Sequence, residues 1–113
     1  MPRRVCARPR SVSLRPLRVL AALLLADGRL VPMWALRRVP SPGRLVDGRT
    51  ISTYVGALRA AGVEVEVCGF HGYRLLALPP DALLMDLLAV LDEVKRRWTF
   101  RAAVLICRRR RVA

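Results

Sequence analysis

The chain has 113 residues, of which 54% are hydrophobic, enough for one domain with a core and little else. Its formal net charge of +13, from 21 Lys and Arg against 8 Asp and Glu, points to a polyanionic partner, either nucleic acid or an anionic membrane surface. Lys95 is the only lysine, and so strong a bias toward arginine is also expected of a GC-rich genome.

Cysteine usage and hydropathy exclude several other classes. Cys6, Cys68 and Cys107 are odd in number and have no C-x-x-C spacing, so neither a disulfide framework nor a zinc site is expected. Positive charges near the N-terminus precede no small-residue cleavage site, which argues against a signal peptide. No stretch reaches the ~18 uncharged apolar residues of a membrane span. We therefore expect a cytoplasmic protein with no membrane span.

The N-terminal third predicts a basic arm followed by two helices. Residues 1–13 contain arginines and prolines without periodicity, which predicts a disordered arm that either contacts DNA or is simply solvated. Residues 15–26 are apolar nearly all round and predict a buried helix. A second helix is expected from about Met33 to Val39, with Trp34 and Leu36 in the core. The Pro- and Gly-containing segment 40–47 predicts a long loop.

The middle of the chain predicts a helix over 49–61. Ile51, Val55 and Leu58 fall on one face, Thr50 or a residue just before it can cap the start, and Gly62 can end the helix. The side chains left facing outward are Arg49, Thr50, Thr53, Gly56, Ala57 and Ala60, with Tyr54 and Arg59 on the flanks.

A β-hairpin is expected after this helix. Val63, Val65 and Val67 alternate with glutamates, the pattern of a half-buried strand, and residues 73–78 can return as its partner after a turn at 69–72. His71 is the only histidine. Because no Ser, Cys or carboxylate stands at motif spacing from it, catalysis and metal binding are not expected, and neither is a cofactor.

Two motifs in this region resemble the winged helix of OmpR/PhoB-type transcription regulators. That family has a recognition helix close to R-T-[VI]-x-x-[HY]-[IV]-x-x-L-R and a wing that ends in G-Y-R-[LF]. The matching residues here are Arg49-Thr50-Ile51, Tyr54-Val55, Leu58-Arg59 and Gly72-Tyr73-Arg74-Leu75. The resemblance covers residues 14–78 and implies an α+β fold, a three-helix core with a C-terminal hairpin wing. No receiver domain is expected.

The resemblance also implies which residues contact DNA. A helix in the major groove reads base edges with the side chains opposite its buried face. By the resemblance, the contacting positions are Thr50, Thr53, Tyr54, Gly56, Ala57 and Arg59. With the outward-facing Arg49 and the wing residues, the side chains expected to contact DNA are Arg49, Thr50, Thr53, Tyr54, Arg59, Tyr73 and Arg74, of which Tyr73 is expected to pack with its hydroxyl facing out. Gly56 and Ala57 depart from the family, which has long polar side chains there. Either the helix approaches DNA closely and reads little sequence, or the face serves a protein partner. Phe70 also departs from the usual wing turn.

The C-terminal part carries a further helix, which the family does not normally have. Residues 81–98 predict an amphipathic helix capped by Asp81, with Leu84, Leu87, Leu91, Val94 and Trp98 at spacings of three and four. Packing on the domain's own core, homodimerisation and membrane-surface contact all remain open for this stripe. Residues 99–113 predict a basic tail that ends in an arginine cluster.

Taken together, these features predict a stand-alone bacterial or phage transcription regulator that binds double-stranded DNA and is not an enzyme. By the resemblance, the 40–47 loop is a candidate contact for RNA polymerase. Two alternatives stay open: a protein-interaction module that uses the helix 82–98, and a non-specific nucleic-acid binder.

Overall fold

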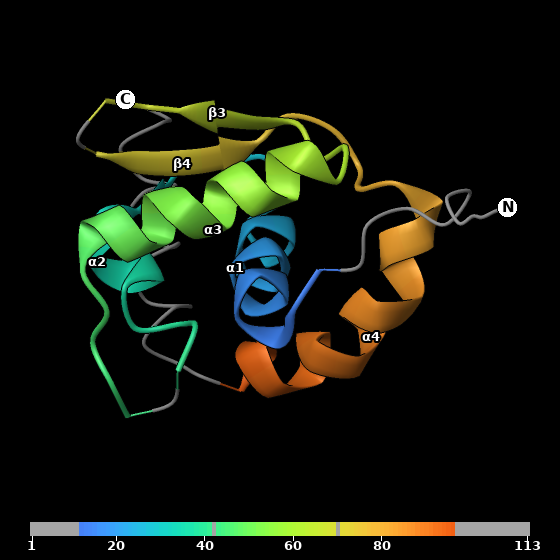
Figure 1. The fold of residues 1–113 in the computed structure, drawn as a ribbon, viewed down its shortest axis with the longest axis horizontal. Coiled ribbons are helices and arrows are strands. Elements are labelled where there is room, and N and C mark those ends of the chain that lie inside the picture. The colour runs from blue at the N-terminus through green and yellow to red at the C-terminus, as the bar shows by residue number, and fades with distance from the viewer. Residues whose placement is uncertain (1–11, 42, 70, 97–113) are drawn as a thin grey trace, which may run out of the picture.

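Helices and a small antiparallel sheet make up the part of the chain that this computed structural model describes, residues 12–41, 43–69 and 71–96 (Figure 1). In chain order the elements are α1 (Leu14–Leu25), β2 (Val31–Pro32), α2 (Met33–Leu36), α3 (Gly48–Ala60), β3 (Val65–Val67), β4 (Gly72–Leu75) and α4 (Asp81–Lys95). The expected α+β class is confirmed. Most of the predicted arm (1–13), Phe70, Trp98 and the predicted tail (99–113) lie outside the described residues.

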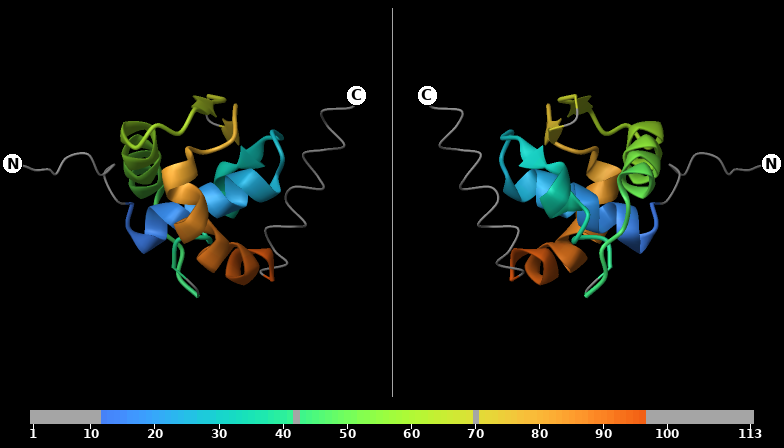
Figure 2. Two further views of the ribbon diagram at one scale, coloured as in Figure 1. Left: turned by 90° about the vertical axis from the view of Figure 1, so that its right-hand side faces the viewer. Right: turned by 90° about the vertical axis from the view of Figure 1, so that its left-hand side faces the viewer.

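Helix α1 is the centre of the fold. Its sequence is apolar on nearly every side, and its residues Val19 to Leu23 are all fully buried. Helices α3 and α4 both pack on it, so it is surrounded as an all-round apolar helix must be. It ends where Asp27 and Gly28 adopt the left-handed conformation, at φ 56° and 82°. Figure 2 shows from two sides that α4 runs away from α3 and the hairpin.

The sheet has the strand order β2-β4-β3 and is antiparallel throughout. Strand β4 lies in the middle, and its Tyr73 pairs with Val31 on one side and Val67 on the other. Gly72 stands opposite Pro32 with φ 154°, and a Cβ there would overlap the Val31 carbonyl oxygen and lie 2.9 Å from the Pro32 Cα. Only glycine therefore permits this approach of β2 to β4.

Helix α2 is shorter than the predicted 33–39, and the expectation that Trp34 seats it in the core is wrong. Trp34 is 48% exposed, whereas Ala35 and Leu36 are buried and Val39 follows them into the core. A helix of one turn can bury only one side. In α2 the buried side is formed by Ala35 and Leu36, and Trp34 lies on the opposite, exposed side. Pro32 precedes the helix as its N-cap.

Helix α4 packs on α1, as self-packing predicts, but with a row of side chains different from the predicted one. The buried residues are Leu83, Leu87, Val90 and Val94, and they belong to the same core as α1 and α3. Of the predicted seam, Leu84 and Leu91 are only half-buried. The N-cap is Pro80, not the expected Asp81, and no side chain caps the helix. Among the described residues, no helix has the length and apolar character needed to cross a bilayer.

Arg18 ties three parts of the fold together. Its guanidinium donates from Nη1 to the Pro40 carbonyl oxygen at 2.7 Å and from Nε to Glu93 Oε1 at 3.2 Å. A second contact, Nη2 to Glu93 Oε2, is also 3.2 Å, and the Arg18 side chain is only 14% exposed. This bidentate pair links α1 to α4, while the carbonyl bond links α1 to the start of the 40–47 loop.

Candidate nucleic-acid interface

The first turn of α3 is fixed by Asp47. The Asp47 carboxylate accepts hydrogen bonds from the Thr50 backbone N–H at 2.9 Å and from the Thr50 hydroxyl at 2.8 Å. Both bonds lower the pKa of Asp47, and the nearby charges of Arg49 and Arg37 lower it further. The cap is thus the residue before the helix, one of the two options predicted, and it uses the Thr50 hydroxyl for folding.

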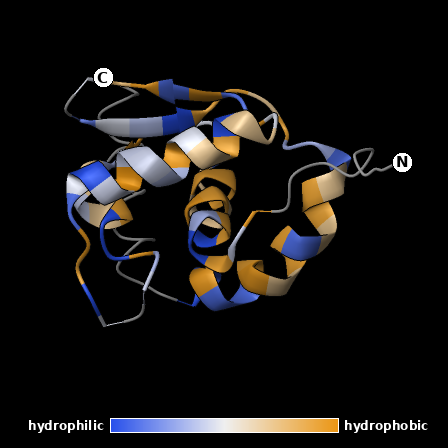
Figure 3. Ribbon diagram, viewed as in Figure 1, coloured by the Kyte–Doolittle hydropathy of each residue, from blue (hydrophilic) through white to orange (hydrophobic). Residues whose placement is uncertain are grey.

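The buried side of α3 matches the prediction. Ile51, Val55 and Leu58 are at most 1% exposed and face the core. The opposite side is exposed and consists of small or basic residues, namely Arg49, Ser52, Thr53, Gly56, Ala57, Arg59 and Ala60. We call this set the outer face of α3. It carries no acidic residue, because the only charged side chains of the helix are arginines. Figure 3 accordingly colours much of α3 in pale tones.

The centre of this face carries no long side chain and is open to solvent. A Cβ built on Gly56 would meet nothing within 4 Å, and its neighbour Ala57 is also exposed. Thr53 donates its hydroxyl hydrogen to the Arg49 carbonyl oxygen at 3.1 Å. The Thr53 hydroxyl can therefore still accept a hydrogen bond, and its methyl group remains available for apolar contact. The backbone of α3 can come close to a flat partner here.

The predicted arginines differ in how firmly they are held. Among the described residues, the Arg49 side chain makes no hydrogen bond or ion pair, and it is exposed. Arg59 donates from Nη2 to the Val65 carbonyl oxygen at 2.8 Å, which joins the end of α3 to β3. Arg74 forms a half-exposed ion pair with Glu66 across the hairpin. Arg49 is therefore the arginine of the predicted set with the most freedom to bind an anion.

Of the two predicted tyrosines, Tyr73 is buried and Tyr54 is half-buried. Tyr73 is only 5% exposed, so it packs as expected, but its hydroxyl is covered instead of facing out. Its Oη lies 3.0 Å from the Ser52 Oγ, which joins β4 to the outer face of α3. Tyr54 is half-buried and packs against the core. Ser52 does not stand out in the sequence, because a serine inside a helix has no pattern that reveals a partner 21 residues away.

The loop between α2 and α3 carries basic side chains that were not singled out in the sequence. Arg37 holds the loop by donating from Nε to the Val46 carbonyl oxygen at 2.7 Å. Beside it, a shallow hollow of about 200 Å³ is lined by Arg38, Gly43, Arg44 and Leu45. Leu45 is 56% exposed, so an apolar side chain stands among arginines on the surface.

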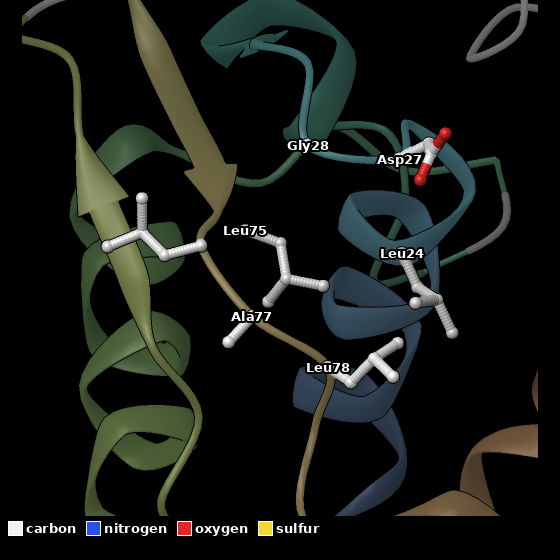
Figure 4. A pocket seen from close by; sticks show the side chains of 7 residues that line it. Leu24, Asp27, Gly28, Leu75, Ala77 and Leu78 are labelled. Carbon is white, nitrogen blue, oxygen red and sulfur yellow. The ribbon is translucent and has the colours of Figure 1, made fainter.

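A second hollow of about 200 Å³ lies between the end of α1 and the segment after β4 (Figure 4). It is lined by Leu24, Asp27, Gly28, Leu75, Leu76, Ala77 and Leu78. Among the described residues that line it, Asp27 carries the one ionisable group, and none has a nucleophilic side chain. Elsewhere, burial and Glu66 raise the pKa of the Cys68 thiol, opposite to what a reactive cysteine needs. Within the described residues, no three His, Cys, Asp or Glu side chains could hold a metal ion.

No protein-family model matches the chain, and neither a curated protein nor a solved structure is significantly similar to it.

Proposed function

We propose that the protein binds double-stranded DNA as a winged helix-turn-helix domain of the OmpR/PhoB type. Helix α3 enters the major groove, and the β3–β4 hairpin lies on the neighbouring backbone as the wing. The observation that carries the proposal is the outer face of α3, which is exposed, free of acidic residues and low at its centre. A helix with these properties can approach the base edges while its arginines meet phosphates.

Electrostatics and geometry support the same arrangement. A net charge of +13 supplies the attraction to phosphate that dominates DNA affinity. Two hydrogen bonds, from Arg59 to the Val65 carbonyl oxygen and between the Ser52 and Tyr73 hydroxyls, join α3 to the hairpin. Among the described residues, the Arg49 side chain makes no hydrogen bond or ion pair, so it can contact a phosphate or a base. Arg74 contributes charge at the wing, shared with Glu66.

Regulation of transcription follows as the role of such a domain, in the cytoplasm of a bacterium or phage-infected cell. The exposed Leu45, set among Arg38 and Arg44, provides a surface for RNA polymerase in the 40–47 loop. No catalytic step is proposed.

One observation favours a second candidate, non-specific binding to nucleic acid. The Thr50 hydroxyl donates to the Asp47 cap and the Thr53 hydroxyl to the Arg49 carbonyl oxygen, and Gly56 and Ala57 offer no hydrogen-bonding side chain. A face of this composition has few groups with which to read bases. The two candidates differ in whether DNA sequence changes the affinity.

Binding to a random duplex pool, followed by recovery and sequencing of the bound fraction, separates them. Wild type is compared with Arg49→Ala and Thr53→Ala, and with Arg15→Ala as a control that removes the same charge from the first turn of α1. We expect enrichment of a motif, lost in Thr53→Ala. Arg49→Ala should reduce the slope of log K against log salt by about 0.9. Binding without enrichment would establish the non-specific candidate, and equal losses in Arg15→Ala and Arg49→Ala would contradict a role for α3.

A further inference from the structure

Helix α4 has a second apolar surface besides the row packed on α1. Met85 is 76% exposed and Leu88 is 62% exposed, while Leu84 and Leu91 are half-buried beside them. Leu84, Leu88 and Leu91 follow one another at i, i+4 and i+7, so they form one continuous stripe, with Met85 at its edge. We call these residues the outer stripe of α4. Figure 3 shows the hydrophobic colouring of α4 interrupted by polar positions.

Opposite charges stand at the two ends of this stripe. Asp81 and Lys95 lie seven residues before and after Leu88, so all three share one side of the helix. Their separation along the helix axis is about 21 Å. Within the described residues, neither Asp81 nor Lys95 takes part in an ion pair, whereas Asp92 pairs with Arg96 and Glu93 with Arg18.

The charge of the whole chain singles out the same helix. Two copies with a net charge of +13 each repel one another over most of their surface. Half of the 8 acidic residues lie on α4, namely Asp81, Asp86, Asp92 and Glu93. Helix α4 is therefore the element along which two copies meet with the least repulsion.

We propose that a second copy of this chain docks on the outer stripe, with the two α4 helices antiparallel about a two-fold axis. Such an interface is self-complementary, because each Asp81 meets Lys95 of the second copy and the two Leu88 side chains meet at the centre. The chain's own segment 97–113 fits less well. Its charged residues are all arginines, so it offers a partner to Asp81 but not to Lys95. This dimer does not depend on DNA binding.

The test is the oligomeric state of the full chain, free of nucleic acid, measured by sedimentation equilibrium. The concentrations run from about 1 µM to about 1 mM, because a contact between two helices is expected to be weak. We expect a monomer–dimer equilibrium. Leu88→Gln removes the central contact and should weaken the dimer about tenfold or more.

Charge exchanges test the antiparallel geometry. Asp81→Lys and Lys95→Asp each place like charges together twice per dimer, and each should raise the dissociation constant about tenfold. The double variant carrying both exchanges recreates both pairs and should restore the wild-type value. Asp86→Lys is the matched control, because it changes the charge equally on the other side of α4.

Circular dichroism melts confirm that each variant is folded. A chain that stays monomeric across the whole concentration range would overturn the proposal. So would a dimer that the exchanges at 81 and 95 leave unchanged, or one that Asp86→Lys weakens equally.

Discussion

Gly56 offers a test in which stability and DNA binding should move in opposite directions. It lies in the interior of α3 with helical backbone, and a Cβ there would meet nothing within 4 Å. Glycine in a helix interior costs about 1 kcal/mol relative to alanine, because more backbone freedom is lost on folding. Gly56→Ala should therefore raise the free energy of unfolding by about 0.5–1 kcal/mol.

In a domain of this size, that gain corresponds to a rise in Tm on the order of 5 °C. Thermal unfolding followed by circular dichroism measures it. The control is the reverse exchange at the neighbouring exposed position, Ala57→Gly, which should lower the Tm by a similar amount. A Gly56→Ala variant with an unchanged or lower Tm would contradict the conclusion that the space around Gly56 is open.

The same variant should bind DNA less tightly. If the α3 backbone approaches the groove at Gly56, an added methyl group keeps the helix away and should weaken binding about tenfold. Ala57→Gly adds no bulk and should not weaken binding through steric exclusion. A more stable Gly56→Ala variant that binds DNA as tightly as wild type would refute the close approach, and α3 would then have to reach DNA through its arginines alone.

Three further outcomes follow from the contacts around α3 and the sheet. Gly72→Ala forces a Cβ into the Val31 carbonyl oxygen, and urea denaturation should show a loss of about 2–4 kcal/mol; an unchanged midpoint would mean that β2 is not held against β4. Tyr73→Phe should cost about 0.5–1.5 kcal/mol, and its effect should not add to that of Ser52→Ala; additive losses would show that the two hydroxyls do not interact. The pKa of Asp47 is lower in the folded protein, so its stabilising effect should be complete above the unfolded pKa near 3.8 and be lost as the pH falls through the folded value. Melts of Asp47→Ala should accordingly lack part of the acid-induced drop in Tm, and an acid profile identical to wild type would rule out this role.

The helices were predicted best where a single sequence pattern decides them. The i, i+4, i+7 spacing of Ile51, Val55 and Leu58 identified both α3 and its buried side, because an amphipathic helix has one way to hide such a stripe. The all-round apolar sequence of α1 likewise predicted its central position. The hairpin was expected in the right region, but its strands are shorter in the structure, and Gly72, predicted in the turn, begins β4.

The errors arose where two candidate faces compete. In α4, the leucines Leu83, Leu84, Leu87, Leu88 and Leu91 are dense enough to support more than one stripe. Only the position of α1 decides that the row containing Leu83 and Val90 is buried. The expectation for Trp34 was wrong for a related reason. A helix of one turn takes its orientation from the elements that pack against it, and its own sequence pattern does not determine which side is buried.

The candidate interface was only partly visible in the sequence. The exposed positions of α3 follow from periodicity, but the partners of their side chains do not. The bonds from Arg59 to the Val65 carbonyl and from Ser52 to Tyr73 depend on how the hairpin lies against α3. That arrangement leaves Arg49 as the free arginine of the predicted set among the described residues, and the sequence alone offers no means to rank it above the others.

The Arg18 bridge has a consequence for where the domain can be cut. A fragment that stopped at Pro80 would keep the α3 face and the hairpin, but it would lose Glu93 and leave the largely buried Arg18 guanidinium without its carboxylate. It would also uncover the side of α1 now shielded by the four buried residues of α4, forfeiting about 6–12 kcal/mol of apolar burial. Because the total stability of a domain is about 5–15 kcal/mol, such a fragment should be strongly destabilised. The stable domain therefore extends at least to Val94, and α4 cannot be removed without loss of stability.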